Sequence, residues 1–162
     1  MALFLSTYIN KIDRKGRVSV PAAFRAALAD QPFQGVVLFR SGQHQCLEGF
    51  GWAAMEEMSS RLDHFDLFSS EQDDLATAIF GEAVQLPFDG DGRIILPKDL
   101  GEFAALFSEN ENAHEGVQSG QAAFVGLGRK FQIWSPEKFE ARKNEARAAV
   151  KDAGLTLPKG EK

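Results

Sequence analysis

Five basic residues lie close together near the start of this chain, in a segment that holds a single carboxylate. They are Lys11, Arg14, Lys15, Arg17 and Arg25. Because Asp13 is the only acidic residue among them, the segment 11–25 carries a net charge of +4. Clustered Lys and Arg side chains attract anions, and they supply many of the contacts that proteins make to nucleic-acid phosphates. The segment therefore predicts an anion-binding surface.

The segment contains a motif that occurs a second time, 76 residues further along the chain (89 − 13). Each copy reads Asp-x-x-Gly-Arg, followed by three mainly aliphatic residues and a proline. The equivalent pairs are Asp13 and Asp89, Gly16 and Gly92, Arg17 and Arg93, and Pro21 and Pro97. A motif of this length at one constant offset indicates a duplicated structural unit.

Each copy has the composition of a β-hairpin followed by a helix. Asp can bond the backbone of a turn, Gly can adopt positive φ, and Pro both ends a strand and suits the first position of a helix. The elements predicted are strands over 6–9 and 18–20 with a helix over 22–28, and strands over 83–88 and 93–96 with a helix from 97. Since side chains alternate along a strand, Val18 and Val20 should share one face, and Arg17 and Ser19 the other.

The second copy differs from the first in charge. Segment 89–102 holds two basic residues against four acidic ones, a net charge of −2. Gly90 and Asp91 replace Arg14 and Lys15, and the counterpart of Arg25 is Gly101. We call the hairpin turn at 13–16 the first tip and the turn at 89–92 the second tip. Only the first tip is therefore predicted to bind an anion strongly.

Within the motif, the aspartates are predicted to be structural. A carboxylate pointed at a phosphate would repel it, whereas Asp13 and Asp89 can fix the turn and pair with Arg17 and Arg93. Arg17, beside other cations, is expected to contribute to binding. Arg93, beside two carboxylates, is expected to brace its turn or a neighbouring subunit, with at most a secondary contact.

The remaining sequence suggests five parts: a first repeat (4–50), connecting helices (51–80), a second repeat (81–134), a helix (135–150) and a tail (151–162). Further strands are expected at 35–40, 45–48 and 122–127 and around Ile133, and helices over 52–62 and from Ser70 as N-cap to Gly81.

The repeat offset grows from 76 to 86 residues after the second short helix. Ten residues are thus inserted within the polar, acidic stretch 108–120, which is predicted to be a loop lying away from the basic tip.

Composition restricts the class of protein. The chain has 162 residues, 44 % hydrophobic residues and a formal net charge of −5, which suits one domain or two fused units. It lacks an apolar run of about 20 residues that could span a bilayer, and its first residues do not resemble a signal peptide. With Cys46 as the single cysteine, no internal disulfide can form, so a cytoplasmic protein is expected.

Other chemistries are weakly supported. Paired aspartates occur in aspartic proteases, but neither Asp13 nor Asp89 is followed by the Thr/Ser-Gly of those enzymes. The Asp89 segment lacks the glycine and glutamate positions of a calcium loop. His44 and Cys46 offer only one close pair of zinc ligands. We find no nucleophile–base pattern, and we expect neither an enzyme nor a cofactor, metal or small-molecule substrate.

The doubled motif resembles the MraZ family, the bacterial regulators of the division and cell-wall gene cluster. The similarity runs from Phe4 to about Arg147, and it is carried by Asp13-Arg-Lys-Gly-Arg17, Pro21-Ala-Ala-Phe-Arg25, Asp89-Gly-Asp-Gly-Arg93-Ile-Ile-Leu-Pro97 and Phe131-Gln-Ile-Trp-Ser-Pro136. This resemblance implies a β-rich α+β fold of two AbrB-like swapped-hairpin units interlocked in one pseudo-dimeric barrel. It also implies sequence-specific binding of double-stranded DNA through the two tips, ring-like homo-oligomers, repeated promoter boxes, a mainly repressive action and a nucleoid location.

Two alternatives stay open. An AbrB-type transition regulator or antitoxin usually carries one motif and a partner-binding tail, which the doubled motif and short tail disfavour. A structural barrel with merely solvated tips would not bind DNA. Assembly is expected because the chain is rich in large apolar residues for its size, with fourteen Phe, some of which are expected to lie between subunits. Several basic tips side by side would also offset the acidic total charge.

Overall fold

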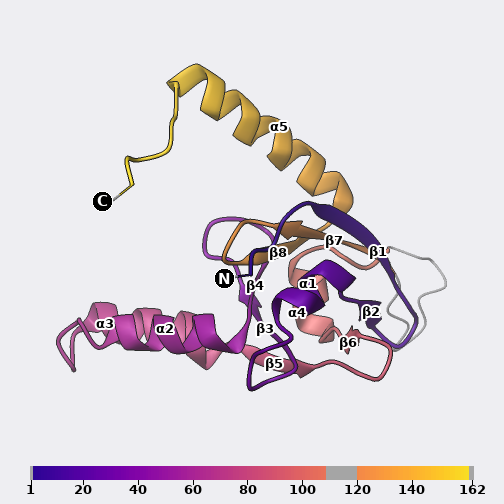
Figure 1. Ribbon diagram of the computed structural model, residues 1–162, viewed down its shortest axis with the longest axis horizontal. Helices are drawn as coiled ribbons and strands as arrows, with labels where there is room; N and C mark the ends of the chain where they lie inside the picture. The colour runs from indigo at the N-terminus through magenta and orange to yellow at the C-terminus, as the bar shows by residue number, and fades with distance from the viewer. Residues whose placement is uncertain (1, 109–119, 161–162) are drawn as a thin grey trace.

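The computed structural model describes residues 2–108 and 120–160, which form a β-rich barrel with short helices among its strands and longer helices extending from its margins (Figure 1). The first half contains β1 (Thr7–Ile12), β2 (Arg17–Ser19), α1 (Ala22–Ala27), β3 (Gly35–Arg40), β4 (Leu47–Phe50), α2 (Trp52–Leu62), α3 (Ser70–Ala76) and the π-helical turn η1 (Thr77–Gly81). The second half contains β5 (Val84–Pro87), β6 (Arg93–Ile95), α4 (Lys98–Phe103), β7 (Gly120–Gly126), β8 (Phe131–Trp134) and α5 (Pro136–Ala153). Strand, turn, strand and helix thus occur twice, as the repeated motif predicts.

The strands of the two repeats are interlocked in one antiparallel sheet, in the order β5-β3-β4-β8-β7-β1-β2-β6. β1 of the first repeat pairs along its whole length with β7 of the second, from Thr7 opposite Val125 to Ile12 opposite Gly120. In the equivalent place β3 pairs with β5. The two end strands, β5 and β6, follow one another through the second tip, so the sheet closes almost completely. The expected swapped-hairpin barrel is confirmed.

A pseudo-two-fold axis relates the two repeats. Val18 lies opposite Ile94 in the β2–β6 pair, and these residues are 76 positions apart. Leu47 lies opposite Ile133 in the β4–β8 pair, and these are 86 positions apart. A residue that pairs with its own counterpart marks such an axis. Residues that the sequence relates by offsets of 76 and 86 positions therefore pair directly with one another in the sheet.

The core fills the barrel with the inward side chains of both repeats. Val18 and Val20 and their counterparts Ile94 and Leu96 are each 1 % exposed, which confirms the predicted alternation along these strands. Phe24 of α1 lies among other phenylalanines, with its ring centroid 5.1 Å from that of Phe4. Full burial of each such side chain stabilises the fold by about 1.5–3 kcal/mol. The short strands that carry the two tips therefore pack on this core.

Several element boundaries differ from the sequence prediction. Ser69 rather than Ser70 is the N-cap of α3, and its Oγ accepts a 3.1 Å hydrogen bond from the Gln72 backbone. The strand expected at 45–48 lies two residues later, because pairing with β3 begins at Leu47, opposite Arg40. α5 continues three residues beyond 150 and ends at Gly154 in the left-handed conformation, where φ is +60°.

Helices extend from the barrel in two directions (Figure 1). α2 and α3 run side by side on one margin, whereas α5 leaves another margin and projects away from the sheet. α5 is attached near its start, where Phe139 packs on Trp134 at 6.1 Å between ring centroids. Within 2–108 and 120–160, no helix is both long and apolar enough to cross a membrane.

Candidate nucleic-acid interface

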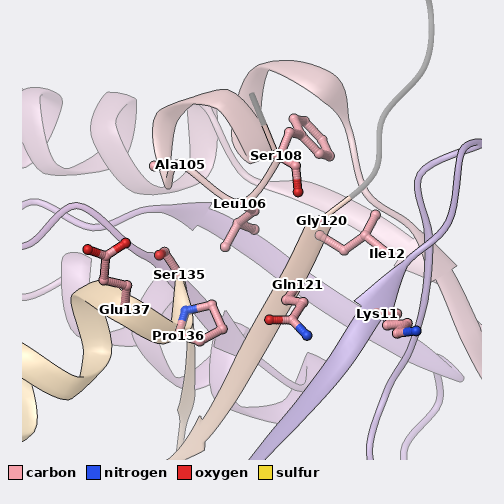
Figure 2. Close-up of a pocket in the computed structure, with 11 residues that line it drawn as sticks. Lys11, Ile12, Ala105, Leu106, Ser108, Gly120, Gln121, Ser135, Pro136 and Glu137 are labelled. Atoms are coloured by element: carbon pink, nitrogen blue, oxygen red, sulfur yellow. The ribbon is translucent and has the colours of Figure 1, made fainter. Parts of the chain in front are cut away.

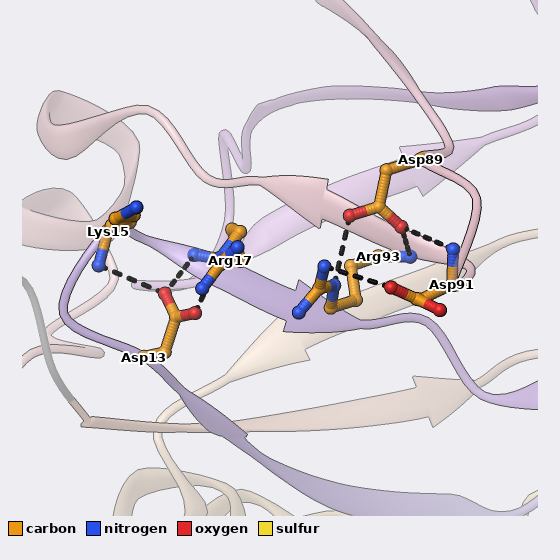
Figure 3. A network of polar contacts seen from close by, with 6 residues as sticks. All are labelled: Asp13, Lys15, Arg17, Asp89, Asp91 and Arg93. Carbon is orange, nitrogen blue, oxygen red and sulfur yellow. Dashed lines mark hydrogen bonds and ion pairs between the residues drawn. The ribbon is translucent and has the colours of Figure 1, made fainter.

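The first tip is a turn held together by the side chain of Asp13 (Figure 3). Its Oδ1 accepts hydrogen bonds from the backbone N–H groups of Lys15 (3.0 Å) and Arg17 (2.8 Å). Its Oδ2 accepts a hydrogen bond from the side chain of Arg17, through Nε, at 2.6 Å. Gly16 closes the turn by donating to the Asp13 carbonyl at 3.0 Å, with φ at +82°. The aspartate, the glycine and the arginine of the motif are thus explained by the geometry of one turn.

The second tip repeats these bonds (Figure 3). Asp89 Oδ1 accepts from the backbone N–H groups of Asp91 and Arg93, both at 2.9 Å, and Oδ2 accepts from Arg93 Nε at 2.9 Å. Gly92 donates to the Asp89 carbonyl at 3.0 Å and has φ at +76°. The predicted structural role of both aspartates, and their pairing with the two arginines, is confirmed.

Both aspartates are stabilised in the charged form. The backbone N–H of Arg93 is the main cause that lowers the pKa of Asp89, with further bonds from Asp91 and the Arg93 side chain. At Asp13, partial desolvation acts to raise the pKa, but the bonds from Arg17 and Lys15 together hold it below its ordinary value. Charge-assisted hydrogen bonds of this kind are stronger than neutral ones. The turns are therefore braced at neutral pH.

The outer residues of the two turns differ. Arg14 and Lys15 are exposed at the first tip, and neither forms an ion pair within the described residues. At the second tip, Arg93 Nη2 forms a second ion pair with Asp91 at 3.1 Å. Arg17 has one carboxylate partner among the described residues, and it meets that partner through Nε, so its terminal nitrogens form no ion pair there. The first tip is thus the one that offers cations to an outside anion.

Arg25 lies at the second tip, not at the first. Its guanidinium lies so close to Gly92 that a Cβ there would be 2.6 Å from Arg25 Cζ. The reason is the strand swap, since the backbone N–H of Val20, directly after β2, donates to the Gly92 carbonyl at 3.1 Å. Grouping all five cations at one tip is therefore wrong.

This placement changes the charge of each tip. The first tip keeps Lys11, Arg14, Lys15 and Arg17 against Asp13, a net charge of +3. The second tip has Arg25 and Arg93 against two carboxylates and is neutral. The predicted asymmetry remains, but it is smaller than the linear sequence indicates. The Arg25–Gly92 contact was missed, although the swapped topology implied by the family resemblance places these segments together.

The insertion within the second repeat starts and ends beside the first tip. The prediction that this loop lies away from the first tip concerns residues 109–119, which lie outside the described residues. Its two anchors are described: Gly120 lies opposite Ile12 and forms a bridge with Phe107. Next to them is a pocket of about 560 Å³ whose polar lining includes Lys11, Gln121 and Glu137 (Figure 2). Lys11 therefore lies between the first tip and this pocket.

The other candidate ligands serve packing. The Cys46 side chain is fully buried, and its burial together with the nearby Glu48 carboxylate raises the pKa of the thiol to about 12. His44 packs its ring on Trp134 at 5.5 Å between centroids. No group of three His, Cys, Asp or Glu side chains within 2–108 and 120–160 is placed to hold a metal ion.

The fold and the tips define a class: a duplicated AbrB-like swapped-hairpin barrel with two Asp-braced turns on neighbouring strands. The chain matches the family model described as "MraZ protein, putative antitoxin-like" over residues 3–77 and 79–156. It is 43 % identical over 157 residues to the transcriptional regulator MraZ of Rickettsia rickettsii (strain Sheila Smith), and 41 % identical to that of Rickettsia akari (strain Hartford). In each comparison 97 % of both chains is covered. The chain belongs to the MraZ family.

Proposed function

We propose that this chain is a transcriptional regulator that binds double-stranded DNA through its two tips. The observation that carries the proposal is the first tip, where four cations surround one carboxylate that is already used inside the turn. Because the Asp13 oxygens are occupied by Arg17 and backbone N–H groups, they do not oppose a phosphate as a free carboxylate would. The relatives named as transcriptional regulators support the same conclusion.

The strand arrangement suits a duplex. β2 and β6 pair antiparallel between the two tips, from Arg17 opposite Ile95 to Ser19 opposite Arg93. A two-stranded ribbon fits the major groove, and exposed cations at its ends can reach the phosphates on either side. Ser19 and Ile95 are exposed on the outer face of this ribbon, where they can approach base edges. Arg14 and Lys15 then fix position, and the ribbon reads sequence.

Assembly compensates for the weak binding of a single chain. The chain has a net charge of −5, so one subunit combines a local +3 with a repulsive remainder. A ring-like homo-oligomer that presents several tips would bind repeated promoter boxes through effective concentration. We propose that the boxes lie in the promoter of its own division and cell-wall gene cluster. Binding there acts mainly as repression, by a cytoplasmic, nucleoid-associated protein that needs no cofactor and catalyses no reaction.

An electrophoretic shift across a salt series tests this function. The probes are a duplex from the region upstream of the gene and a scrambled duplex of equal length and composition. We expect the upstream duplex to bind more tightly, with affinity falling steeply as salt increases because neutralised phosphates release counterions. Equal, salt-insensitive or absent binding of both duplexes would instead favour the structural-barrel alternative.

A further inference from the structure

Arg25 is a first-repeat residue that completes the second tip. Its Nε donates to the Val20 carbonyl of its own repeat at 3.1 Å. The rest of the guanidinium lies against Gly92, where a Cβ would be 2.7 Å from Arg25 Nη1. A glycine at position 92 is therefore required twice, for its positive φ and for the space that Arg25 occupies. One hydrogen bond and one backbone surface fix the position of the guanidinium.

The first tip has no equivalent. Leu96 donates to the Gly16 carbonyl at 2.8 Å, so α4 begins beside the first tip as α1 begins beside the second. The counterpart of Arg25 on α4, however, is Gly101, and a Cβ there would overlap the ring of Phe107. An aromatic ring thus lies beside the position from which a cation could extend. A cation of the other repeat thus lies against the turn glycine of the second tip, whereas the equivalent position of α4 is occupied by Gly101.

The terminal nitrogens of Arg25 differ from those of Arg93 in what they contact. Arg93 is held by Asp89 and Asp91, which satisfies its charge inside the turn. Arg25 forms no ion pair with any carboxylate of the described residues, and within them its side-chain hydrogen bond uses only Nε. An arginine fixed through Nε keeps both terminal nitrogens for a further acceptor, and a phosphate matches that pair of donors.

We propose that Arg25 and the second tip form one composite contact for a DNA phosphate. The first-repeat guanidinium takes the place of the cations that the second turn lacks at Gly90 and Asp91. Without Arg25 the second tip carries a net charge of −1, and with it the tip is neutral. Arg25 thus reduces the charge difference between the two tips, so that both tips can face the same duplex. This inference rests on the proposed DNA-binding function.

The test compares two arginine and two glycine variants in the full-length protein. Arg25→Gln removes the charge, and Arg25→Lys keeps it. Gly92→Ala inserts a methyl group where the guanidinium lies, and Gly128→Ala is its matched control, since Gly128 also has positive φ (+86°) but no atom within 4 Å of an added Cβ. Arg147→Gln, at an exposed position of α5, controls for loss of charge elsewhere.

Affinity for the upstream and scrambled duplexes is measured across a salt series, with the melting temperature of each variant. We expect Arg25→Gln to weaken binding of both duplexes about 10-fold and to reduce the salt slope by about 1. Arg25→Lys should keep the slope. Gly92→Ala should weaken binding as Arg25→Gln does, beyond the effect of Gly128→Ala, and should add nothing in the Arg25→Gln background.

Three results overturn the composite contact. An unchanged affinity and slope in Arg25→Gln would show that Arg25 does not meet the DNA. A lower melting temperature with an unchanged slope would make it a brace of the barrel. A loss confined to the upstream duplex would make it a reader of bases rather than of phosphate. The proposed function is tested separately by the double variant Arg14→Ala with Lys15→Ala. If this double variant loses tight, salt-dependent DNA binding and Arg25→Gln keeps it, only the composite contact is overturned.

Discussion

At the first tip, Asp13 holds a turn whose outer residues are Arg14 and Lys15, whereas at the second tip Asp89 holds the same turn with Gly90 and Asp91 outside. The bonds within the turns agree to within 0.3 Å, from 2.6 to 2.9 Å for the side-chain pair and from 2.8 to 2.9 Å for the backbone of the arginine. The charges around them differ by three units, +3 against zero. The comparison separates the positions that make a turn from those that make a surface.

The shared residues are those whose atoms are used inside the turn. Asp accepts three hydrogen bonds, Gly supplies positive φ, and Arg returns one bond to the carboxylate. The residues between Asp and Gly contribute only backbone to the turn, except that Asp91 also pairs with Arg93. Side chains there can change without loss of the turn, so one duplicated scaffold can present two electrostatically different tips.

The largest effect that would break this comparison is expected from Arg14→Ala with Lys15→Ala. Removing both cations should weaken DNA binding on the order of 100-fold and reduce the salt slope by about 2, because two fewer phosphates are neutralised. Fluorescence anisotropy across a salt series measures both quantities. Arg147→Ala with Lys151→Ala on α5 is the matched control. An intact affinity and slope would remove the first tip from the interface.

A smaller effect is expected from the two equivalent arginines, Arg17 and Arg93. Arg17→Ala should weaken binding about 10-fold, since its terminal nitrogens form no ion pair with a carboxylate of the described residues. Arg93→Ala should change affinity about 2-fold at most and should lower the melting temperature more than Arg17→Ala, because Asp89 and Asp91 are left facing one another. Fluorescence anisotropy measures the affinity of each variant, thermal scans measure its melting temperature, and light scattering measures its assembly. Equal losses of binding at unchanged stability and assembly would make the two tips equivalent.

Asp91→Lys tests whether charge alone separates the tips. The change adds two positive units at the second turn and removes a partner of Arg93, so DNA binding should become about 3-fold tighter with a steeper salt dependence. Asp91→Asn should give an intermediate result. Weaker binding in both variants would show that the Asp91–Arg93 pair, rather than the net charge, matters for the complex.

The smallest effect concerns acid stability. Asp13 and Asp89 have lowered pKa values in the folded protein, so their contribution to stability is complete above the unfolded pKa of about 4. That contribution is lost as pH falls through the lower folded pKa. Asp13→Asn with Asp89→Asn should therefore lower the melting temperature at pH 7, and the difference from the wild type should shrink below about pH 4. Asp63→Asn is the control, since Asp63 lies exposed between α2 and α3. A difference that stays constant down to pH 2.5 would contradict the ionic bracing.

Much of the fold was predictable because local chemistry and repetition agree. Asp-x-x-Gly specifies its own turn through bonds that span four residues, so Asp13 and Gly16 could be interpreted without the fold. The alternation of Val18 and Val20 predicted the core face because a strand has a period of two. The offsets of 76 and 86 predicted two units and a ten-residue insertion. Which strands pair between the units came from the family resemblance and not from the residues themselves.

The sequence by itself determined both turns, the buried face of each short strand, and the excess of positive charge at the first motif. Each of these depends on residues a few positions apart, where spacing along the chain is also distance in space. Only the tertiary structure decided where Arg25 acts. Five residues separate Arg25 from Val20 but 67 separate it from Gly92, and the swapped pairing of β2 with β6 brings the guanidinium to the distant turn. The charge of a tip is a sum over neighbours in space, and here one neighbour comes from the other repeat.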